Sequence, residues 1–412
     1  MSKKTKILLY SHDTFGLGHL RRSLSIAGQI ARDVPQAHQL LITGSMVAGA
    51  FSLPPRLDLI KLPALSKRSN GRYKARVLPL TLRQAITWRE QMILQAVANF
   101  QPDLVLVDKV AGGVQGEMLP ALHYLRAYSP HTRLVLGMRD IEDSPEMTQR
   151  EWAANGTPDL QAQMYDAILL YGDQAVFDPV AAYGMSPTAA NKLISCGYLR
   201  RVNQTRAAGD IRRELNAQNG PLIVVTVGGG GDGYDILKTY LEMLSQSASL
   251  PVAHHLLVTG PLMPQRKRQT LRRLAAELPV TFMEFTADLE SYLAAADLVI
   301  SMAGYNTVCE LLSLNQRVLL IPRGHTRAEQ RIRATLLVER GLAQMLPPEA
   351  LTPQRMRQAV LSALNNPRPT QPLNLNGLEN VGRAIANLLR PEAVYRPPSQ
   401  LQRHTILEEL TA

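Results

Sequence analysis

The chain has 412 residues, which is more than one hydrophobic core usually spans, so we expect two compact domains with a cleft between them. Hydrophobic residues make up 45% and charged residues 19% of the sequence, a composition that excludes wholesale disorder. The formal net charge of +11 favours an anionic partner: nucleic acid, phospholipid head groups or a phosphorylated small molecule. The two cysteines, Cys196 and Cys309, are far apart in the sequence, which excludes a disulfide framework or a CxxC metal site.

The N-terminal segment is expected to form a first strand. Its apolar run, Ile7–Tyr10, is too short for the core of a signal peptide. No later stretch approaches the roughly 20 apolar residues that a membrane span requires. We therefore expect a cytoplasmic protein that can also contact the inner face of the membrane as a peripheral protein.

Short runs rich in Val, Ile and Leu recur along the chain, each followed by a loop and a longer segment of helical periodicity. This alternation is typical of βα units in a parallel sheet, and therefore of an α/β fold. The first series of runs contains Lys6–His12, Gln39–Thr43, Leu57–Leu62, Asp103–Asp108, Arg133–Met138 and Ala167–Tyr171. The second series contains Leu222–Val227, His255–Thr259, Val280–Glu284, Leu298–Ser301 and Arg317–Ile321.

The stretch between the two series, residues 178–220, has only one short apolar run and is typical of a connector. We therefore place an N-terminal domain at residues 1–200. A C-terminal domain at residues 201–390 includes the helical stretches that follow the second series. Residues 391–412 lack a clear core pattern and are expected to form a tail that is poorly ordered or docked on the surface.

Basic residues concentrate in one stretch of the N-terminal half. Between Arg56 and Arg89, nine Lys and Arg residues stand against a single acid, Asp58. Apolar residues, including Tyr73 and Trp88, interleave with them, so the stretch suits shallow contact with an anionic membrane or with a lipid-linked phosphate. An ordinary solvated loop and helix face is the alternative interpretation.

The first strand is followed by a glycine loop that ends in a histidine, Gly16-Leu17-Gly18-His19, and then by a helical stretch. Such glycines let the backbone approach a ligand closely, and the helix N-terminus offers N–H groups to an anion. The dinucleotide pattern GxGxxG is not met, so the loop does not indicate NAD binding. A pair of turn glycines beside a structural histidine is the alternative.

A second glycine loop opens the second series, where Val224–Val227 is followed by Gly228-Gly229-Gly230-Gly231-Asp232-Gly233. Loops with so little side-chain bulk commonly let phosphates reach main-chain N–H groups. No Gly-Lys-Ser/Thr follows, so this is not a Walker loop. Four consecutive glycines cost more conformational entropy than a flexible turn requires, which favours phosphate binding.

The most specific segment begins where a strand ends at Ser301 and continues through residues 302–307 to Glu310. After the next strand, the loop Pro322-Arg323-Gly324-His325 leads to the pair Glu329-Gln330. This arrangement suits a nucleotide sugar: a helix N-terminus for the diphosphate, a carboxylate for the ribose hydroxyls, and a carboxylate–amide pair for the sugar hydroxyls.

This segment resembles the donor site of the GT-B glycosyltransferases, most closely family 28. That family carries a Ser-x-x-Gly-x-x-Thr-x-x-Glu motif, then a Pro-x-x-His loop that leads to Gln-Gln and Asn-Ala pairs. The residues in register are Ser301, Gly304, Thr307, Glu310, Pro322, His325, Gln330 and Ala334. The two glycine loops also lie where the family has its loops, so the resemblance runs from residue 1 to about 390. Glu329 stands at the position of the first Gln and Arg333 at that of the Asn, which leaves the identity of the sugar open.

The resemblance implies a GT-B fold, in which two Rossmann-like domains face a cleft, the first binding the acceptor and the second the donor. It also implies an inverting transfer of a hexose or N-acetylhexosamine from a nucleotide diphosphate sugar, with UDP as the expected nucleotide. The acceptor would be a hydroxyl group, with a lipid-linked molecule or a polysaccharide as candidates. No cofactor is expected, because the nucleotide sugar is a substrate. No metal is expected either, because the sequence contains no Asp-x-Asp.

His19 is the candidate catalytic base, because the pKa of histidine is ordinarily near neutral. His12 and Asp13 are second choices or an orienting pair. The resemblance places the nucleotide base against backbone groups around Phe285 and Thr286. The complete set of donor-binding candidates is Gly18, Gly229, Gly230, Gly231, Phe285, Thr286, Ser301, Ala303, Gly304, Thr307, Glu310, His325, Glu329 and Gln330.

Two other classes of function remain as alternatives. A sugar-nucleotide epimerase or hydrolase would use the same two-domain architecture, so the fold alone does not exclude it. A nucleic-acid-binding protein is suggested only by the net charge. The sequence carries no recognisable helix-turn-helix or aromatic stacking platform, so nucleic acid is not an expected partner.

Overall fold

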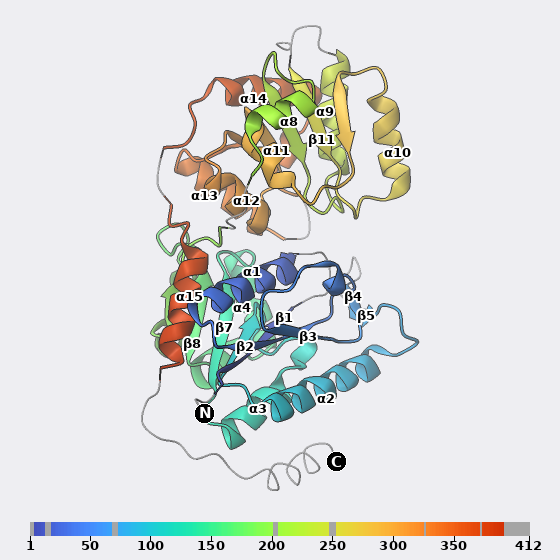
Figure 1. Cartoon of the computed structure of the whole chain (residues 1–412). Helices are drawn as coiled ribbons and strands as arrows, with labels where there is room; N and C mark the ends of the chain where they lie inside the picture. Colours follow the sequence, from blue (N-terminus) through green and yellow to red (C-terminus); the bar gives the residue numbers. More distant parts are fainter. Residues whose placement is uncertain are drawn as a thin grey trace. The chain divides into compact units, whose positions relative to one another are not determined.

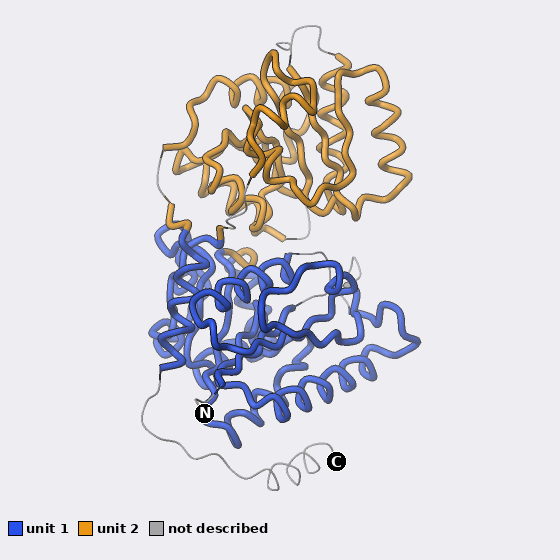
Figure 2. The backbone as a smooth tube through the Cα atoms, in the orientation of Figure 1, with its two compact units in different colours: residues 1–140, 145–199, 376–412 blue, residues 141–144, 200–375 orange. Residues whose placement is uncertain are grey.

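The computed structural model describes residues 4–12, 18–67, 73–200, 205–246, 253–324, 327–370 and 373–390. The chain forms two compact units, which are coloured separately in Figure 2. The first contains Met1–Asp140, Pro145–Leu199 and the segment from Asn376. The second contains Ile141–Ser144 and Arg200–Leu375.

The first unit is built on a sheet of seven parallel strands, in the order β3-β2-β1-β6-β7-β8-β9. Its central strands consist of apolar residues that are buried on both faces, which is characteristic of a parallel sheet covered by helices. The strands are β1 (Lys6–Ser11), β2 (His38–Thr43), β3 (Leu57–Lys61), β6 (Leu104–Asp108), β7 (Arg133–Arg139), β8 (Ala167–Tyr171) and β9 (Leu193–Ser195). A separate antiparallel pair joins β4 (Leu65–Lys67) to β5 (Tyr73–Ala75).

Helices connect and cover these strands, as Figure 1 shows. The longest, α2 (Leu82–Phe100), begins with a capping box in which the side chains of Thr81 and Gln84 bond each other's backbone N–H groups. The others are α1 (Gly18–Asp33), α3 (Leu119–Tyr128), α4 (Pro145–Ala154), α5 (Thr157–Asp159), α6 (Pro179–Tyr183), α7 (Pro187–Ala190) and α15 (Gly377–Leu388). Short helical turns lie at η1 (Ala48–Ala50), η2 (Val114–Gly116) and η3 (Leu160–Met164).

The second unit has six parallel strands in the order β12-β11-β10-β13-β14-β15. Two apolar core clusters pack on this sheet, and together they include residues from every helix of the second unit named below. The strands are β10 (Leu222–Thr226), β11 (His254–Val258), β12 (Val280–Met283), β13 (Leu298–Ser301), β14 (Val318–Leu320) and β15 (Gln344–Met345). The helices are α8 (Ala208–Glu214), α9 (Tyr234–Gln246), α10 (Gln265–Leu274), α11 (Leu289–Ala295), α12 (Tyr305–Ser313), α13 (Glu329–Glu339) and α14 (Pro353–Asn365), with the turn η4 (Pro348–Ala350).

Both sheets reverse their strand order once, the first between β1 and β6 and the second between β10 and β13. Such a reversal is the topological switch point of a Rossmann-like sheet, and ligands bind there beyond the carboxyl ends of the strands. The predicted α/β fold with two Rossmann-like domains is therefore confirmed. The sequence analysis did not identify β9 and β15, two short strands at the sheet edges.

The segment from Asn376 packs on the first unit, although the sequence analysis assigned residues 201–390 to a single C-terminal domain. In Figure 1, α15 lies alongside α1, and its apolar face (Leu378, Val381 and Ile385) is buried. Helical periodicity predicts an apolar face but does not specify which sheet layer that face will cover. The chain passes from the first unit to the second after Leu199, next to the expected boundary. The predicted tail, residues 391–412, lies outside the described residues.

The basic stretch between Arg56 and Arg89 does not form one solvated face. Arg89 is 0% exposed and donates to Glu117 at 2.5 Å, while the hydroxyl of Tyr10 donates to the same carboxylate at 2.6 Å. This guanidinium therefore belongs to a buried ion pair inside the first unit. Arg68 and Arg72 lie outside the described residues. Over the part of the chain that is described, no helix is long and apolar enough to cross a membrane.

Substituting Gly377 with alanine tests the docking of α15. A Cβ at this position would lie 2.5 Å from the backbone oxygens of Gly197 and Tyr198, so the start of the helix would have to move. We expect a loss of about 1–3 kcal/mol in the free energy of unfolding, measured by chemical denaturation. Gly49→Ala is the control, because no atom lies within 4 Å of its added Cβ. Equal stability of the two variants would contradict the close packing at Gly377.

Candidate functional site

The switch point of the first sheet brings His19 to Asp108. His19 is the second residue of α1, which follows β1, and Asp108 is the last residue of the neighbouring strand β6. The His19 Nδ1 atom lies 2.6 Å from Asp108 Oδ2. Arg22, one turn further along α1, donates to both carboxylate oxygens of Asp108 at 2.8 and 2.9 Å. The three side chains form a compact charged cluster at the place where the fold predicts a ligand.

His19 Nδ1 lies close to two groups: Asp108 Oδ2 at 2.6 Å, which can only accept, and Arg22 Nη2 at 2.8 Å, which can only donate. The contact with Asp108 is the shorter, so we assign the proton to Nδ1, which leaves Nε2 as the acceptor. The His19 side chain is 17% exposed. Burial lowers the pKa of His19 below its usual value, although Asp108 opposes this shift. Burial alone would raise the pKa of Asp108, but the charges of Arg22 and His19 outweigh it and hold that pKa well below its usual range.

Sequence reasoning selected His19 but missed Asp108 and Arg22. A signal was present, because Asp108 ends a strand that a Rossmann-like order places next to β1. His12, a second choice, is buried and its ring centroid lies 5.4 Å from that of His19. Asp13, the other second choice, lies outside the described residues. Gly18 is the first residue of α1.

The second glycine loop, after β10, contains Gly229, Gly230 and Gly231. Gly230 has a φ of +89°, and a Cβ there would lie 2.2 Å from the carbonyl oxygen of Thr259, in the loop after β11. The Leu262 N–H also donates to the Gly229 carbonyl at 2.8 Å. Close packing between these two loops therefore explains why position 230 requires glycine.

The loop after β13 delivers Ser301, Ala303 and Gly304 to the switch point of the second sheet. Gly304 is the N-cap of α12, and no side chain caps this helix end. An anion could therefore take the place of a side-chain cap at the backbone N–H groups of the first turn. The Ser301 hydroxyl donates to the Met302 carbonyl at 3.1 Å. Thr307 and Glu310, one turn apart within α12, are both half-buried.

The loop after β14 leads to Glu329 and Gln330, the first two residues of α13. Both are buried, and the Arg323 backbone N–H donates to Gln330 Oε1 at 3.1 Å. Asp143 Oδ1 accepts from the Ala328 N–H at 2.7 Å, just before the helix begins. The Gln330 Nε2 atom lies 4.0 Å from the position of a Cβ on Gly304, so the predicted pair adjoins the start of α12.

Arg333, which departs from the family pattern, has a structural contact. Its side chain is fully buried and donates from Nη1 to the Ala303 carbonyl at 2.8 Å. It thereby ties α13 to the loop that precedes α12. Sequence reasoning treated this position only as a source of doubt about the sugar.

Phe285 and Thr286 follow β12, which is two strands away from β10 at the edge of the sheet. Phe285 is 50% exposed. The Glu284 carbonyl accepts from the Gly260 N–H at 3.0 Å, and the loop of Gly260 packs on the glycine loop, so these loops adjoin along one sheet edge. His325 lies outside the described residues. Among those that are described, no group of His, Cys, Asp and Glu side chains could hold a metal ion.

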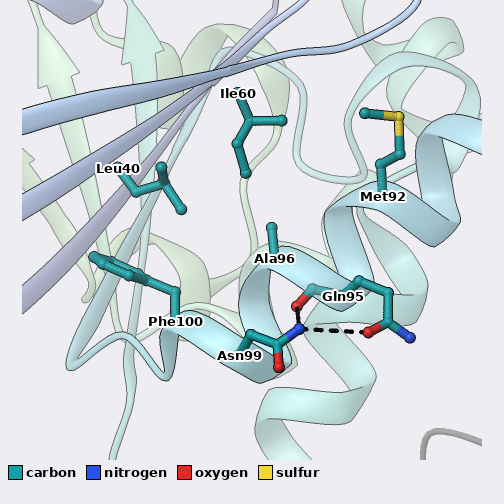
Figure 3. Close-up of a pocket in the computed structure, with 7 residues that line it drawn as sticks. All are labelled: Leu40, Ile60, Met92, Gln95, Ala96, Asn99 and Phe100. Atoms are coloured by element: carbon teal, nitrogen blue, oxygen red, sulfur yellow. Dashed lines mark hydrogen bonds between the residues drawn. The ribbon is translucent and has the colours of Figure 1, made fainter.

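A cavity of about 560 Å³ lies elsewhere, between α2 and strands β2 and β3 of the first unit (Figure 3). Its lining is mainly apolar and includes Leu40 near the start of β2 and Phe100 at the end of α2. Because the end of α2 leads into the start of β6, the cavity lies at the amino ends of the strands. It is therefore not part of the site at the carboxyl edge.

Comparisons with known proteins agree with this arrangement. Residues 223–385 match the glycosyltransferase family 28 C-terminal domain. This part of the chain is similar to the family 28 glycosyltransferases, and the chain as a whole has the GT-B fold. A relative from Methylibium petroleiphilum, named UDP-N-acetylglucosamine--N-acetylmuramyl-(pentapeptide) pyrophosphoryl-undecaprenol N-acetylglucosamine transferase, is 28% identical over 246 residues, which cover 58% of this chain and 64% of the relative. The chain also matches two further relatives of that name, and these matches cover 50% and 49% of the relatives' own length.

Solved structures show the same fold at lower sequence identity. MurG from Acinetobacter baumannii is 16% identical, with a TM-score of 0.59 over 94% of this chain and 99% of that one. The UDP-GlcNAc 2-epimerase from Methanocaldococcus jannaschii is 12% identical, with a TM-score of 0.60 over 94% of this chain and 99% of that one. Likeness at this level of identity shows the fold alone and does not identify the reaction.

Two glycine variants should separate a binding role from a packing role. Gly304 has a φ of −69°, and only Gln330 comes as close as 4.0 Å to an added Cβ, so Gly304→Ala should fold normally. We expect it to weaken UDP binding about tenfold, the equivalent of one lost charge-assisted hydrogen bond, in isothermal titration calorimetry. Gly230→Ala should instead lower the stability of the ligand-free protein by about 1–3 kcal/mol. Unchanged UDP affinity in Gly304→Ala would remove the start of α12 from the site.

Proposed function

We propose that the chain transfers a hexose or N-acetylhexosamine from a UDP-sugar to an acceptor hydroxyl, with inversion at the anomeric carbon and without a metal ion. The observation that carries this proposal is the 2.6 Å contact between His19 and Asp108 at the switch point of the first sheet. It provides a histidine whose Nε2 can accept a proton at neutral pH, which an attacking hydroxyl requires.

In the proposed reaction, Nε2 of His19 takes the proton of the acceptor hydroxyl as its oxygen attacks the anomeric carbon. Asp108 holds the Nδ1–H tautomer and stabilises the imidazolium that forms, while remaining ionised. Arg22 fixes the Asp108 carboxylate through three hydrogen bonds, so the imidazole keeps its orientation. Attack from one face of the sugar, opposite the leaving diphosphate, accounts for the inversion.

The leaving UDP carries negative charge that must be stabilised as the bond breaks. We assign this role to the N–H groups at the start of α12 and to the glycine loop after β10, since helix N-termini favour anions. Glu310 would accept hydrogen bonds from the ribose hydroxyls. The absence of an Asp-x-Asp motif from the sequence supports a mechanism without a metal ion.

The relatives' names direct the choice of substrates to test. They describe the transfer of N-acetylglucosamine from UDP to a pyrophosphoryl-undecaprenol acceptor, so UDP-N-acetylglucosamine and lipid-linked pyrophosphates are the first choices. Isotopically labelled donor, incubated with protein and a membrane extract, should release UDP while the label moves to the acceptor. A changed sugar on UDP, or free sugar without an acceptor product, would instead indicate an epimerase or a hydrolase.

A lipid-linked acceptor would require contact with a membrane, and we assign this contact to the surface around residues 74–88. Val77, Leu78 and Trp88 are exposed apolar residues there. Exposed basic side chains surround them in the sequence, namely Lys74, Arg76 and Arg83. Apolar insertion combined with attraction to anionic lipids is the usual basis of peripheral binding at the cytoplasmic face of a membrane.

Variants of the His19 pair test the catalytic assignment. His19→Ala should lower kcat about a hundredfold or more while leaving donor affinity near normal, because it removes the base but no donor contact. Asp108→Asn should also lower kcat, since the asparagine no longer fixes the required tautomer. Wild-type turnover in His19→Ala would remove this residue from the mechanism.

The pH profile gives a second test of the same pair. The lowered pKa of His19 keeps Nε2 unprotonated below the usual histidine pKa, so kcat should fall only when the pH drops through that lowered value. Because Asp108 raises the pKa of His19, Asp108→Asn should move this acid limb to a still lower pH. An acid limb that does not move in Asp108→Asn would contradict the coupling of the two groups.

Sedimentation with lipid vesicles tests the membrane surface. The double variant Val77→Asp, Trp88→Glu should bind vesicles of 30% phosphatidylglycerol about tenfold more weakly than the wild type, since it removes apolar area and adds negative charge. Binding should also weaken as salt is added. Val338→Asp is the control, because Val338 is an exposed apolar residue on α13 of the second unit. Equal binding by the double variant and the wild type would exclude this surface.

A further inference from the structure

Arg323, in the loop after β14, contacts residues from two other parts of the second unit. Its Nη1 lies 3.5 Å from Asp232 Oδ2, in the glycine loop after β10. Its Nη2 donates to Glu329 Oε1 at 3.2 Å, at the start of α13. Strand β13 lies between β10 and β14. Arg323 therefore links the loop after β10 to the loop after β14, and the loop that contains Gly304 follows the strand between them.

Two atoms of this cluster are buried without a hydrogen-bond partner among the described residues. One is Oε2 of Glu329, a side chain that is only 5% exposed. The other is Nε of Arg323. One is an acceptor and the other a donor, on side chains that already touch. A buried charged group without its hydrogen bonds is costly, so both atoms call for a polar ligand.

The position of the cluster indicates which part of a donor would lie against it. Gln330, the neighbour of Glu329, has its amide nitrogen 4.0 Å from the Cβ position of Gly304. The N–H groups of α12 begin at Gly304, where the diphosphate is assigned. A group attached to that diphosphate and lying beside the helix start is therefore within reach of Glu329 and Arg323.

We propose that Arg323 is a specificity-determining residue, which together with Glu329 selects a neutral sugar over a uronic acid. The proposal rests on the proposed function and deepens it. A sugar hydroxyl both accepts and donates, so a single hydroxyl satisfies the Arg323 Nε–H and the Glu329 Oε2. The carboxylate of a uronic acid only accepts, and it would bring a second negative charge to the unpartnered oxygen of Glu329. Asp232 holds Arg323 in place from the opposite side.

The test compares the affinities of UDP, UDP-glucose, UDP-N-acetylglucosamine and UDP-glucuronate by isothermal titration calorimetry. The wild type should bind at least one neutral UDP-sugar about tenfold or more tightly than UDP-glucuronate. Arg323→Ala should lose about tenfold in affinity for that neutral UDP-sugar while its affinity for UDP stays within about twofold. Glu329→Gln should reduce the ratio of the affinity for the neutral UDP-sugar to the affinity for UDP-glucuronate about tenfold, because the glutamine amide can donate to a carboxylate.

Two further variants guard against a purely structural effect. Arg323→Lys keeps the positive charge near Asp232 but lacks the Nε–H, so it should fold normally and still lose the sugar-dependent gain over UDP. Arg331→Ala is the matched control, because this arginine lies on α13 two residues after Glu329, is 53% exposed and pairs with Glu349. It should retain every affinity of the wild type.

Equal loss of UDP and UDP-sugar binding in both Arg323 variants would overturn the proposal, as would tight binding of UDP-glucuronate by the wild type. If the wild type binds UDP and the Arg323 variants keep the wild-type ratio of UDP-sugar affinity to UDP affinity, only this inference fails. If the wild type binds neither UDP nor any UDP-sugar, the proposed function fails with it.

Discussion

The order of the parallel strands is the constraint on which the candidate site in each unit depends. Where the order reverses, the chain leaves two adjacent strands toward opposite faces of the sheet, so their loops diverge and the ends of the following helices stay accessible. In the first sheet this brings together His19, after β1, and Asp108, at the end of β6. In the second it brings the glycine loop after β10 next to the loop of Gly304 after β13. Neither pair is close in sequence.

Much of this arrangement could be predicted from the sequence, because the signals are local. Buried strands of Val, Ile and Leu predicted both sheets, and the segment from Ser301 to Gln330 predicted a site at the carboxyl edge of the second. What could not be predicted depends on contacts between distant elements. In the sequence, nothing distinguishes Asp108 from any other acid at the end of a strand, and only the strand order places it beside His19. The helix at 377–388 is amphipathic in sequence, but only packing shows that it covers α1.

The glycines in the loop after β10 have a structural reason that the sequence does not reveal. They were interpreted as space for phosphates. The structure adds a packing demand, since Gly230 and Gly260 have positive φ angles. A Cβ on Gly230 would lie 2.2 Å from the Thr259 carbonyl oxygen, and a Cβ on Gly260 would lie 2.3 Å from the Gly228 carbonyl oxygen. Gly304 has neither constraint, so close packing does not account for glycine there, and the diphosphate contact that we propose would. The two kinds of glycine are indistinguishable in a sequence.

The two departures from the family pattern on α13 are best understood together. Glu329 replaces a neutral glutamine and Arg333 replaces a neutral asparagine, and the two positions lie four residues apart, hence on one face of the helix. A buried carboxylate introduced alone would lack a counter-charge, which commonly costs several kcal/mol. Arg323 supplies one contact to Glu329, and Arg333 adds a second buried positive charge one turn away. The two departures therefore balance each other in formal charge on one face of α13. In the proposed donor site, Glu329 would offer two acceptor oxygens where a glutamine offers one, and Arg333 fixes the Ala303 carbonyl beside it.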